Sequence, residues 1–285
     1  MSIFIALADS TIQPFSSPIL PMAALAALAV TIAIGVFKPR SILGPQRLSP
    51  GESPRIVIGI IGFALAAWAL SMLALGACHQ WLLKTHHQPQ ATPLSDAETV
   101  LFGAAMDLAV LVAILAMTLN RPDGFRRMGI NLSRFPAGLL GGIFAIAIVL
   151  PLIFYVDALT QMVLNRLHIS PPPHDLLQIL KAHPAPWLSA ADVLAACVIA
   201  PIAEEMFFRG LIQTALRYLL KHPWPAVLLT AALFAMVHPW WTWPQIFFLG
   251  ICLGYVYERT GNLWTSVVLH SLFNITSMWL FVHFG

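Results

Sequence analysis

The sequence predicts an all-α fold, a polytopic transmembrane helix bundle of about eight spans, on the basis of two observations. Of its 285 residues 59% are hydrophobic and 9% are charged, and the mean hydropathy is +0.80, far outside the range of soluble globular domains. The apolar residues also form long continuous runs, whereas the strands of a transmembrane barrel alternate every two residues. Because backbone groups in hydrocarbon must be hydrogen-bonded internally, we expect these runs to be helices.

Eight runs approach the roughly 20 apolar residues that a helix needs to cross a bilayer. We place the spans at about 18–37, 56–83, 98–119, 137–160, 189–216, 223–239, 243–257 and 262–283. Residues 1–17 contain Asp9 and no Lys or Arg, so the basic flank of a signal peptide is missing and we expect the first run to be a mature span. Cys78, Cys197 and Cys252 lie inside spans and are expected to be small core residues.

We expect a single transmembrane domain over residues 1–285, with a scaffold in residues 1–188 and a catalytic core in residues 189–285. Asp107 is the only acid near the middle of a scaffold span. Residues 161–188 are rich in proline and are expected to form an extended external loop. Several histidines lack metal-ligand spacing and are expected to be solvated: His86, His87, His168, His174 and His183.

The placement of basic residues predicts the orientation. If the N-terminus lies outside, eleven of the fifteen Lys and Arg residues fall on the opposite side, three fall on the same side, and Arg209 lies within a span. Lys and Arg of short loops favour the cytoplasm, so both termini are expected outside the cytoplasm. The basic residues flank spans and do not cluster with aromatic residues, so we expect no nucleic-acid partner.

The fifth span carries two acids and an arginine near its middle, between Pro201 and Arg209. Each charge costs about 2.5 to 3.5 kcal/mol at the centre of a membrane helix. Glu205 and Arg209 are four residues apart on one face and are expected to form a structural ion pair. Glu204 is rotated by about 100° from Glu205 and needs a partner on another helix. Pro201 should free the carbonyl of Cys197, bend the helix and leave a small polar cavity.

Three further polar residues lie on later spans, His238 near the end of the sixth and His270 and Asn274 on the eighth. Each also has a structural interpretation, as a buried core histidine or as an interhelical hydrogen bond. At about 1.5 Å per residue, Glu204 and these three residues lie about 12 to 22 Å into their spans. Ionisable groups at one depth on separate helices are expected to converge on a water-containing cavity.

Such a set can hydrolyse an amide without a covalent nucleophile. Glu204 with His238 could hold and deprotonate a water, while His270 and Asn274 offer N–H donors for the oxyanion of a tetrahedral intermediate. Glu204, His238 and His270 could instead bind zinc, which would activate its own water. The spacing leaves both open. The sequence has no His-Glu-x-x-His motif, no Gly-x-Ser-x-Gly elbow and no Gly-rich phosphate loop.

Three motifs on the late spans resemble those of the type II CAAX prenyl endopeptidases, also called the CPBP or Abi family of intramembrane proteases: Glu204-Glu205-x-x-x-Arg209, Phe234-x-x-x-His238 and His270-x-x-x-Asn274. The resemblance covers roughly residues 190–280. It implies an eight-helix-type membrane fold and an endopeptidase. It further implies that Glu204 and His238 activate water and that His270 and Asn274 stabilise the oxyanion.

The resemblance also implies a membrane-embedded or lipidated protein or peptide as the substrate, in an integral protein of the bacterial cytoplasmic (inner) membrane. Eukaryotic members trim three residues from prenylated C-termini, but many relatives have no known prenylated substrate. Members have been described as metalloproteases and as glutamate proteases. We favour the form without a cofactor, because a buried Glu204 can act as a base unaided, and keep zinc as the alternative.

Two other classes of protein stay open. A proton- or ion-coupled transporter would use Glu204, Glu205 and Arg209 as a relay. A non-catalytic membrane scaffold or immunity protein would use the same polar residues to pack helices. Apart from Asp107, the mid-span ionisable residues cluster in one half of the chain without a matching motif in the other, which disfavours the transporter.

Overall fold

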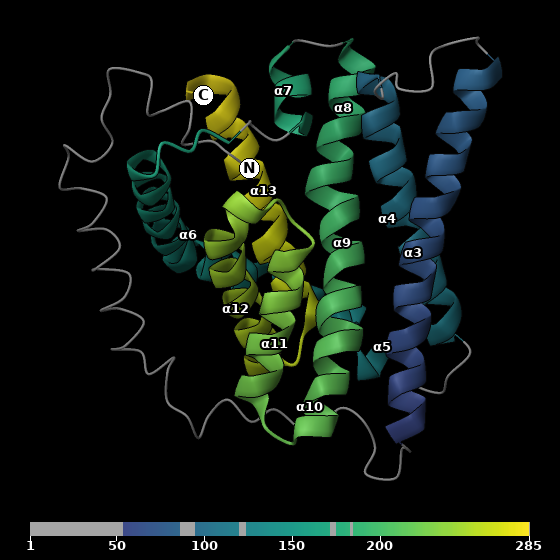
Figure 1. The fold of residues 1–285 in the computed structure, drawn as a ribbon. Coiled ribbons are helices and arrows are strands. Elements are labelled where there is room, and N and C mark those ends of the chain that lie inside the picture. Colours follow the sequence, from purple (N-terminus) through teal and green to yellow (C-terminus); the bar gives the residue numbers. More distant parts are fainter. Residues whose placement is uncertain (1–53, 86–94, 120–123, 172–174, 183–184, 285) are drawn as a thin grey trace.

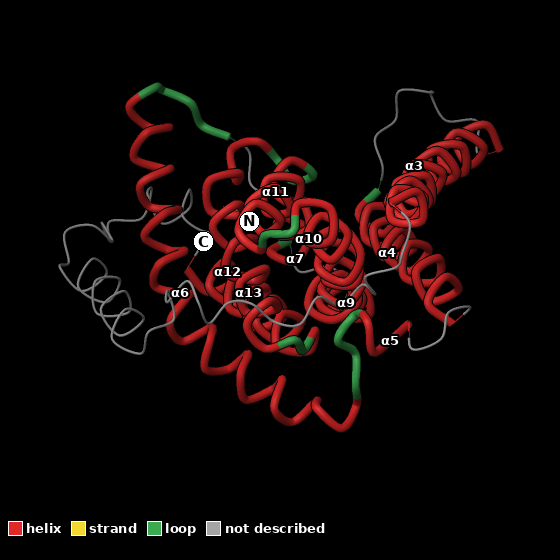
Figure 2. Tube along the Cα trace, turned by 90° about the horizontal axis from the view of Figure 1, so that it is seen from below, coloured by secondary structure: helices red, strands yellow, loops and turns green. Residues whose placement is uncertain are grey.

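The computed structural model describes residues 54–85, 95–119, 124–171, 175–182 and 185–284. Within these ranges the chain is helical and contains no strand, and the helices pack side by side as a bundle (Figures 1 and 2). The all-α prediction is confirmed. The predicted span at 18–37 lies outside the described residues, as do His86, His87, His174 and His183.

Each of the seven later predicted spans coincides with a helix. The long helices are α3 (Pro54–Thr85), α4 (Asp96–Leu119), α6 (Phe135–Arg166), a composite helix over Pro186–Leu220, α11 (Pro223–Met236), α12 (Trp243–Thr260) and α13 (Leu263–Phe284). The composite helix consists of α8 (Pro186–Leu194), the π-helical η3 (Ala195–Ile199), α9 (Ala200–Glu205), the π-helical η4 (Met206–Gln213) and α10 (Thr214–Leu220). Short helices connect them: α5 (Gly124–Arg127), η2 (Leu132–Arg134), α7 (Asp175–Lys181) and η5 (Trp240–Thr242).

Five helical stretches of the described chain are long and apolar enough to cross a membrane: Leu65–Thr85, Asp96–Ala116, Gly124–Arg166, Pro186–Leu220 and Leu263–Phe284. The span predicted at 223–239 is instead the shorter helix α11, of 14 residues, whereas the span predicted at 243–257 is the 18-residue helix α12, which is not among these five stretches. A helix of the length of α11 covers about 21 Å, less than the roughly 30 Å hydrocarbon core. Both helices stop short of the end of the bundle where α7 and α8 lie, so the turn after α11 is placed within the bundle (Figure 1).

The prediction of an extended loop at 161–188 is wrong. Helix α6 continues to Arg166, the short helix α7 follows, and α8 begins at Pro186. Leu177 and Ile179 of α7 are buried, so the segment returns to the bundle and covers apolar surface. Pro186 begins α8, because a proline is well accommodated in the first helical turn. His168 is exposed, as expected for a solvated residue.

Glycines allow two pairs of helices to approach closely. A Cβ atom added to Gly138 of α6 would lie 2.6 Å from the Cβ of Trp264 on α13, and one added to Gly142 would lie 2.6 Å from the Cβ of Val268. Gly250 of α12 faces α11 in the same way. Small residues spaced four apart are typical of closely packed membrane helices. This packing fixes α13 and α12, which carry partners for the polar residues of the composite helix.

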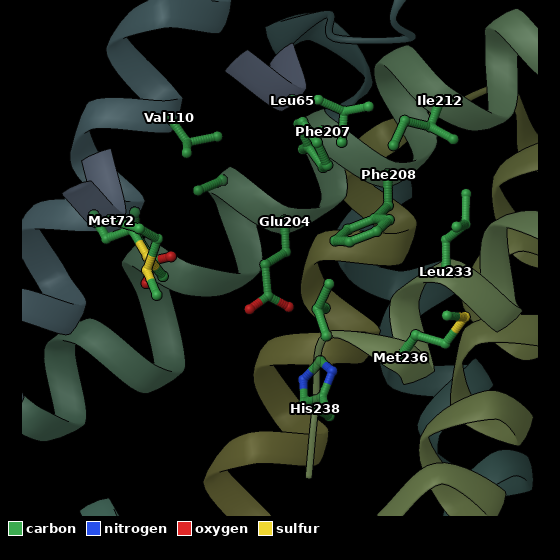
Figure 3. A pocket seen from close by; sticks show the side chains of 14 residues that line it. Leu65, Met72, Val110, Glu204, Phe207, Phe208, Ile212, Leu233, Met236 and His238 are labelled. Carbon is green, nitrogen blue, oxygen red and sulfur yellow. The ribbon is translucent and has the colours of Figure 1, made fainter. Parts of the chain in front are cut away.

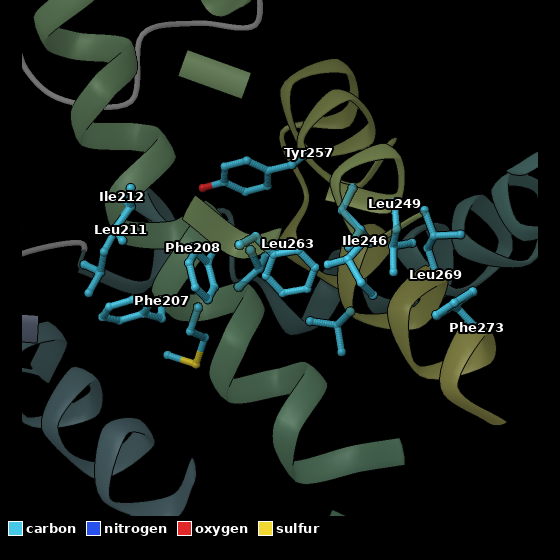
Figure 4. Packing of buried hydrophobic residues seen from close by; sticks show 14 of the residues in the cluster. Phe207, Phe208, Leu211, Ile212, Ile246, Leu249, Tyr257, Leu263, Leu269 and Phe273 are labelled. Carbon is cyan, nitrogen blue, oxygen red and sulfur yellow. The ribbon is translucent and has the colours of Figure 1, made fainter. Parts of the chain in front are cut away.

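The apolar core lies where η4, α11, α12 and α13 meet (Figure 4). Phe208 of η4 and Phe234 of α11 stack edge to face with ring centroids 5.1 Å apart. Phe234 and Leu249 are almost completely buried. These rings lie beside the buried polar residues of the composite helix and limit the room around them.

Helix α3 packs at the edge of the bundle, next to α4 (Figures 1 and 2). Its described side chains are largely exposed, including Leu70 and Leu73, as expected for a helix that faces lipid. Cys78 on α3 is exposed as well, so the prediction that it is a core residue is wrong. Cys197 is buried, and Cys252 is partly buried.

Candidate functional site

A change in hydrogen-bond register along the composite helix shapes the site. Pro201 has no backbone N–H, and the residues before it form the π-helical η3, in which a carbonyl binds the N–H five residues later. In that register the partner of the Ala196 carbonyl would be the N–H of residue 201, and Pro201 has none. Nδ2 of Asn274 on α13 donates to this oxygen over 2.7 Å. Pro201 does interrupt the helix as predicted, but the carbonyl concerned is that of Ala196 rather than Cys197, because the π register shifts the pairing by one residue.

Glu205 and Arg209 form the predicted ion pair, which is confirmed. Nη1 of Arg209 lies 3.1 Å from Oε1 of Glu205, and both side chains are completely buried. Nη2 of Arg209 donates to the carbonyl of Gly250 on α12 over 3.3 Å, and the guanidinium carbon lies 4.6 Å from the ring centroid of Phe234. A carboxylate, a carbonyl and an aromatic face thus compensate the buried charge.

His270 of α13 lies between the two acids of the fifth span, a contact that the sequence did not predict. Its Nδ1 is 3.1 Å from Oε1 of Glu205, and its Nε2 is 3.8 Å from Oε2 of Glu204. An ionised carboxylate only accepts hydrogen bonds, so Nδ1 is the donor to Glu205. Glu205 therefore holds the ring with Nε2 turned toward Glu204. The sequence did not predict this contact, because helical spacing already gave Glu205 a partner in Arg209. The signal that could have indicated it is the position of Glu205, which directly follows Glu204 in the same span.

His238 follows α11 by two residues and precedes Pro239. Its Nδ1 is 2.7 Å from the carbonyl of Phe234, which can only accept, so Nδ1 is the donor and Nε2 is left with its lone pair. The His238 carbonyl accepts from Nε1 of Trp243 over 2.9 Å, which fixes the turn. The end of α11 thus presents an imidazole whose second nitrogen can act as an acceptor or a base.

Two cavities share the side chains of Asp107, Glu204 and His238. The apolar cavity has a volume of about 490 Å³ and is lined mainly by apolar side chains of α3, α4, η4 and α11. Figure 3 shows Glu204 and His238 within this lining. The polar cavity has a volume of about 330 Å³ and is also lined by His270 and Asn274. The structure therefore brings Glu204, His238, His270 and Asn274 to one cavity, with Glu205 and Arg209 outside its lining.

Asp107 is the residue that sequence reasoning missed. It lies near the middle of α4 and lines both cavities, yet it makes no hydrogen bond to another described residue. An acid in the middle of a membrane span marks a functional site by default. That signal was visible in the sequence, but Asp107 was assigned to the scaffold because no motif on the late spans pointed to α4.

The described part of the chain contains no group of three or more His, Cys, Asp or Glu side chains arranged to hold a metal ion. Glu204, His238 and His270 line one cavity without forming a zinc site in this arrangement. Zinc therefore stays an alternative prediction, which chelation tests.

The fold and the site define a polytopic membrane protein with a Glu/His centre inside its helix bundle. Residues 186–276 match the family described as type II CAAX prenyl endopeptidase, Rce1-like. The match includes every motif residue from Glu204 to Asn274 and leaves out α3, α4 and α6, and it confirms the resemblance for this part of the chain. No curated protein and no solved structure matches the chain.

Proposed function

We propose that this protein is an intramembrane endopeptidase that hydrolyses a peptide bond with a water activated by Glu204 and His238. The observation that carries the proposal is one cavity lined by Glu204, His238, His270 and Asn274, all contributed by the segment that matches the endopeptidase family. Two helices and the turn after α11 contribute these groups within a largely apolar bundle. Preorganised polar groups in such surroundings act more strongly than they do in water.

Water activation falls to Glu204 and His238. Nε2 of His238 can accept one hydrogen of a water, since Nδ1 is bound to the Phe234 carbonyl. The carboxylate of Glu204 accepts the other hydrogen and takes that proton as the water oxygen attacks the substrate carbonyl carbon. When the tetrahedral intermediate collapses, the C–N bond breaks and Glu204 returns the proton to the leaving nitrogen. The products are a carboxylic acid and an amine, and the site regains its starting state.

The oxyanion of the intermediate is assigned to His270 and Asn274. Glu205 accepts from Nδ1 of His270 and leaves Nε2 facing the cavity. Nε2 donates to the oxyanion when the ring carries both protons, and the two carboxylates of Glu204 and Glu205 then balance the two cations, His270 and Arg209. The amide of Asn274 has two N–H donors, of which one binds the Ala196 carbonyl and the second is assigned to the oxyanion. Donors fixed in advance stabilise the transition state without a cost of reorganisation.

Asp107 is assigned to substrate binding. A peptide that enters the cavities brings backbone N–H groups, which cost free energy when they are buried without an acceptor. Asp107 lines both cavities and has no hydrogen-bond donor among the described residues, so its carboxylate is placed to accept a substrate N–H. Asp107 lies outside the segment that matches the family, so the family match by itself does not predict this contact.

The substrate class is a membrane-embedded or lipidated protein or peptide. The apolar cavity includes Leu65 and Met72 of α3, which are 49% and 50% exposed, so its wall is partly open toward lipid. An apolar segment or lipid chain can enter there without crossing water. Cleavage of matched peptides with and without a prenyl group decides whether prenylation is recognised. Faster cleavage of the prenylated peptide supports it, and equal rates contradict it.

The decisive experiment measures cleavage of membrane-bound peptides by the full chain in liposomes, with the products identified by mass spectrometry. Glu204→Gln and His238→Ala should each lower kcat/KM by about 10²- to 10⁴-fold, the usual range for loss of an acid–base group. Glu98→Gln is the matched control, because Glu98 is an acid of α4 that lines neither cavity. Normal turnover by the Glu204 and His238 variants would refute the mechanism.

A proton-coupled transporter is the second candidate, and one observation favours it: His270 links Glu204 to the Glu205–Arg209 pair in a continuous chain of ionisable groups. Such chains move protons in membrane proteins. This function predicts a flux across liposomes that Glu204→Gln abolishes, with no peptide cleavage. Cleavage without flux would exclude it.

We further propose an inner-membrane location with both termini outside the cytoplasm. The C-terminal end of α13 lies at the same end of the bundle as α7 and α8, whereas the basic α10 end lies at the opposite one (Figure 1). Basic residues favour the cytoplasmic side. A reporter fused to the C-terminus that is active only outside the cytoplasm tests this orientation, and activity of a cytoplasm-specific reporter would reverse it.

A further inference from the structure

A second apolar groove lies between α6 and α12, away from the Glu/His site. Its volume is about 280 Å³ and its lining is almost entirely apolar, with residues such as Phe144 and Ile148 of α6 and Cys252 of α12. It shares no lining residue with either cavity of the candidate site. The groove is therefore separate from the proposed reaction.

The length of the groove fits one leaflet of a bilayer. Along α12 its lining extends from Phe248 to Thr260, which corresponds to about 18 Å of helix. The hydrocarbon core of a bilayer is about 30 Å thick, so this length exceeds half of it only slightly. An acyl chain of a single leaflet can therefore lie along the groove from the interface to near the midplane.

Two arginines lie at the Thr260 end of the groove. Arg259 belongs to its lining, and Arg134 donates from Nη2 to the carbonyl of Thr260 over 3.1 Å. The backbone of Arg134 is held in turn, because Nδ2 of Asn262 donates to its carbonyl over 2.9 Å. A guanidinium has five N–H donors, and the bond to Thr260 uses one of them. Both arginine side chains are exposed, so the end of an apolar groove carries two cations within reach of a headgroup.

Two aromatic rings indicate that the Thr260 end of the groove lies at a membrane interface. Trp224 of α11 and Tyr255 of α12 both line the groove, and they stack with centroids 6.0 Å apart. Trp and Tyr concentrate at the headgroup level of membranes, where one side of the ring is apolar and the other is hydrated. Basic pockets between membrane helices on the cytoplasmic side bind anionic lipid headgroups.

We propose that the groove between α6 and α12 binds an anionic phospholipid, with one acyl chain along the groove and the phosphate held by Arg134 and Arg259. The charge of the two arginines selects anionic over zwitterionic lipid, and the apolar length selects a lipid over a free phosphate. This site is independent of the proposed peptidase reaction. The lipid would join α6 to the α11–α12 hairpin, which carries His238.

The test compares thermal melting of the full chain in detergent after addition of phosphatidylglycerol or of phosphatidylcholine with the same acyl chains. Phosphatidylglycerol should raise the Tm clearly more than phosphatidylcholine does, and inorganic phosphate should leave it unchanged. The double variant Arg134→Gln with Arg259→Gln should abolish the difference between the two lipids. Arg166→Gln, at the other end of α6, is the matched control and should keep it.

A second variant tests the groove itself. Ile148→Trp fills the groove from α6, so native mass spectrometry should show loss of the phosphatidylglycerol adduct, whereas Ile143→Trp, at a position outside the lining, should keep it. Equal stabilisation by the two lipids would overturn the proposal. So would an unchanged lipid preference in the double arginine variant. A Tm that responds to neither lipid, as expected if another part of the chain fills the groove, would overturn it as well.

Discussion

His270 donates from Nδ1 to Oε1 of Glu205 over 3.1 Å, and this contact joins the structural ion pair of the fifth span to the candidate catalytic cavity. Nη1 of Arg209 and Nδ1 of His270 both lie 3.1 Å from the same oxygen, Oε1 of Glu205. The second ring nitrogen then lies 3.8 Å from Glu204. The buried Glu205–Arg209 pair therefore also orients the imidazole of His270 toward Glu204.

Glu205→Gln tests that relationship. The amide keeps the size of the side chain but removes one of the two negative charges beside His270 and Arg209, so kcat should fall by about tenfold or more while KM changes little. The variant should also melt at a lower temperature, because Arg209 loses its counter-ion. The rates are measured with the liposome cleavage assay. An unchanged kcat would show that Glu205 serves Arg209 alone.

Arg209→Leu should destabilise the protein by about 3 to 5 kcal/mol, because Glu205 would stay buried without a cation. Thermal melting in detergent measures the loss, with Arg166→Leu as an exposed control on α6. Replacing Glu205 and Arg209 together by Leu should recover part of the stability, since no uncompensated charge remains. A melting temperature equal to that of the unmodified protein would reject the energetic importance of the pair.

Asp107→Leu should raise KM by about tenfold with a smaller effect on kcat, as expected when a charged hydrogen-bond acceptor for the substrate is lost. Asp107→Asn keeps an acceptor oxygen and should stay within a few-fold of the unmodified protein. Asp96→Leu, at the exposed start of the same helix, is the control. If Asp107→Leu changes kcat alone, Asp107 does not contact the ground-state substrate.

Asn274→Ala removes both the donor assigned to the oxyanion and the partner of the Ala196 carbonyl. Loss of one oxyanion donor typically lowers kcat by about 10²- to 10³-fold, and we expect a fall in that range. Stability should fall by about 1 to 3 kcal/mol, because a partly buried carbonyl is left unpaired. Single-turnover rates and melting curves separate the two effects. Lower stability with a normal rate would assign Asn274 to the helix break only.

Exhaustive chelation should leave cleavage unchanged, because Glu204 can take the proton from water without a metal. The assay is repeated after chelator treatment and after addition of zinc. Loss of cleavage on chelation, followed by recovery with zinc, would replace the acid–base mechanism by a metal-assisted one.

Local patterns predicted much of this architecture. The positions of α3, α4, α6 and the later helices follow from apolar runs, and the Glu205–Arg209 pair follows from helical spacing. The same patterns gave a wrong result at 161–188, because proline content suggests a loop but does not show that Leu177 and Ile179 can bury themselves against the bundle. The apolar run also predicted too long a helix for α11, because the helix ends at Met236, before His238.

The sequence by itself determined the helical class, the positions of Glu204, His238, His270 and Asn274 along the predicted spans, and the motifs that match the endopeptidase family, since these depend on periodicity and residue type along single segments. Only the tertiary structure decided that His270 bridges Glu204 and Glu205, that Asn274 binds the Ala196 carbonyl, and that Asp107 shares the cavities. Such contacts depend on how helices rotate and approach one another. Close packing between distant segments sets that geometry, and no local spacing encodes it.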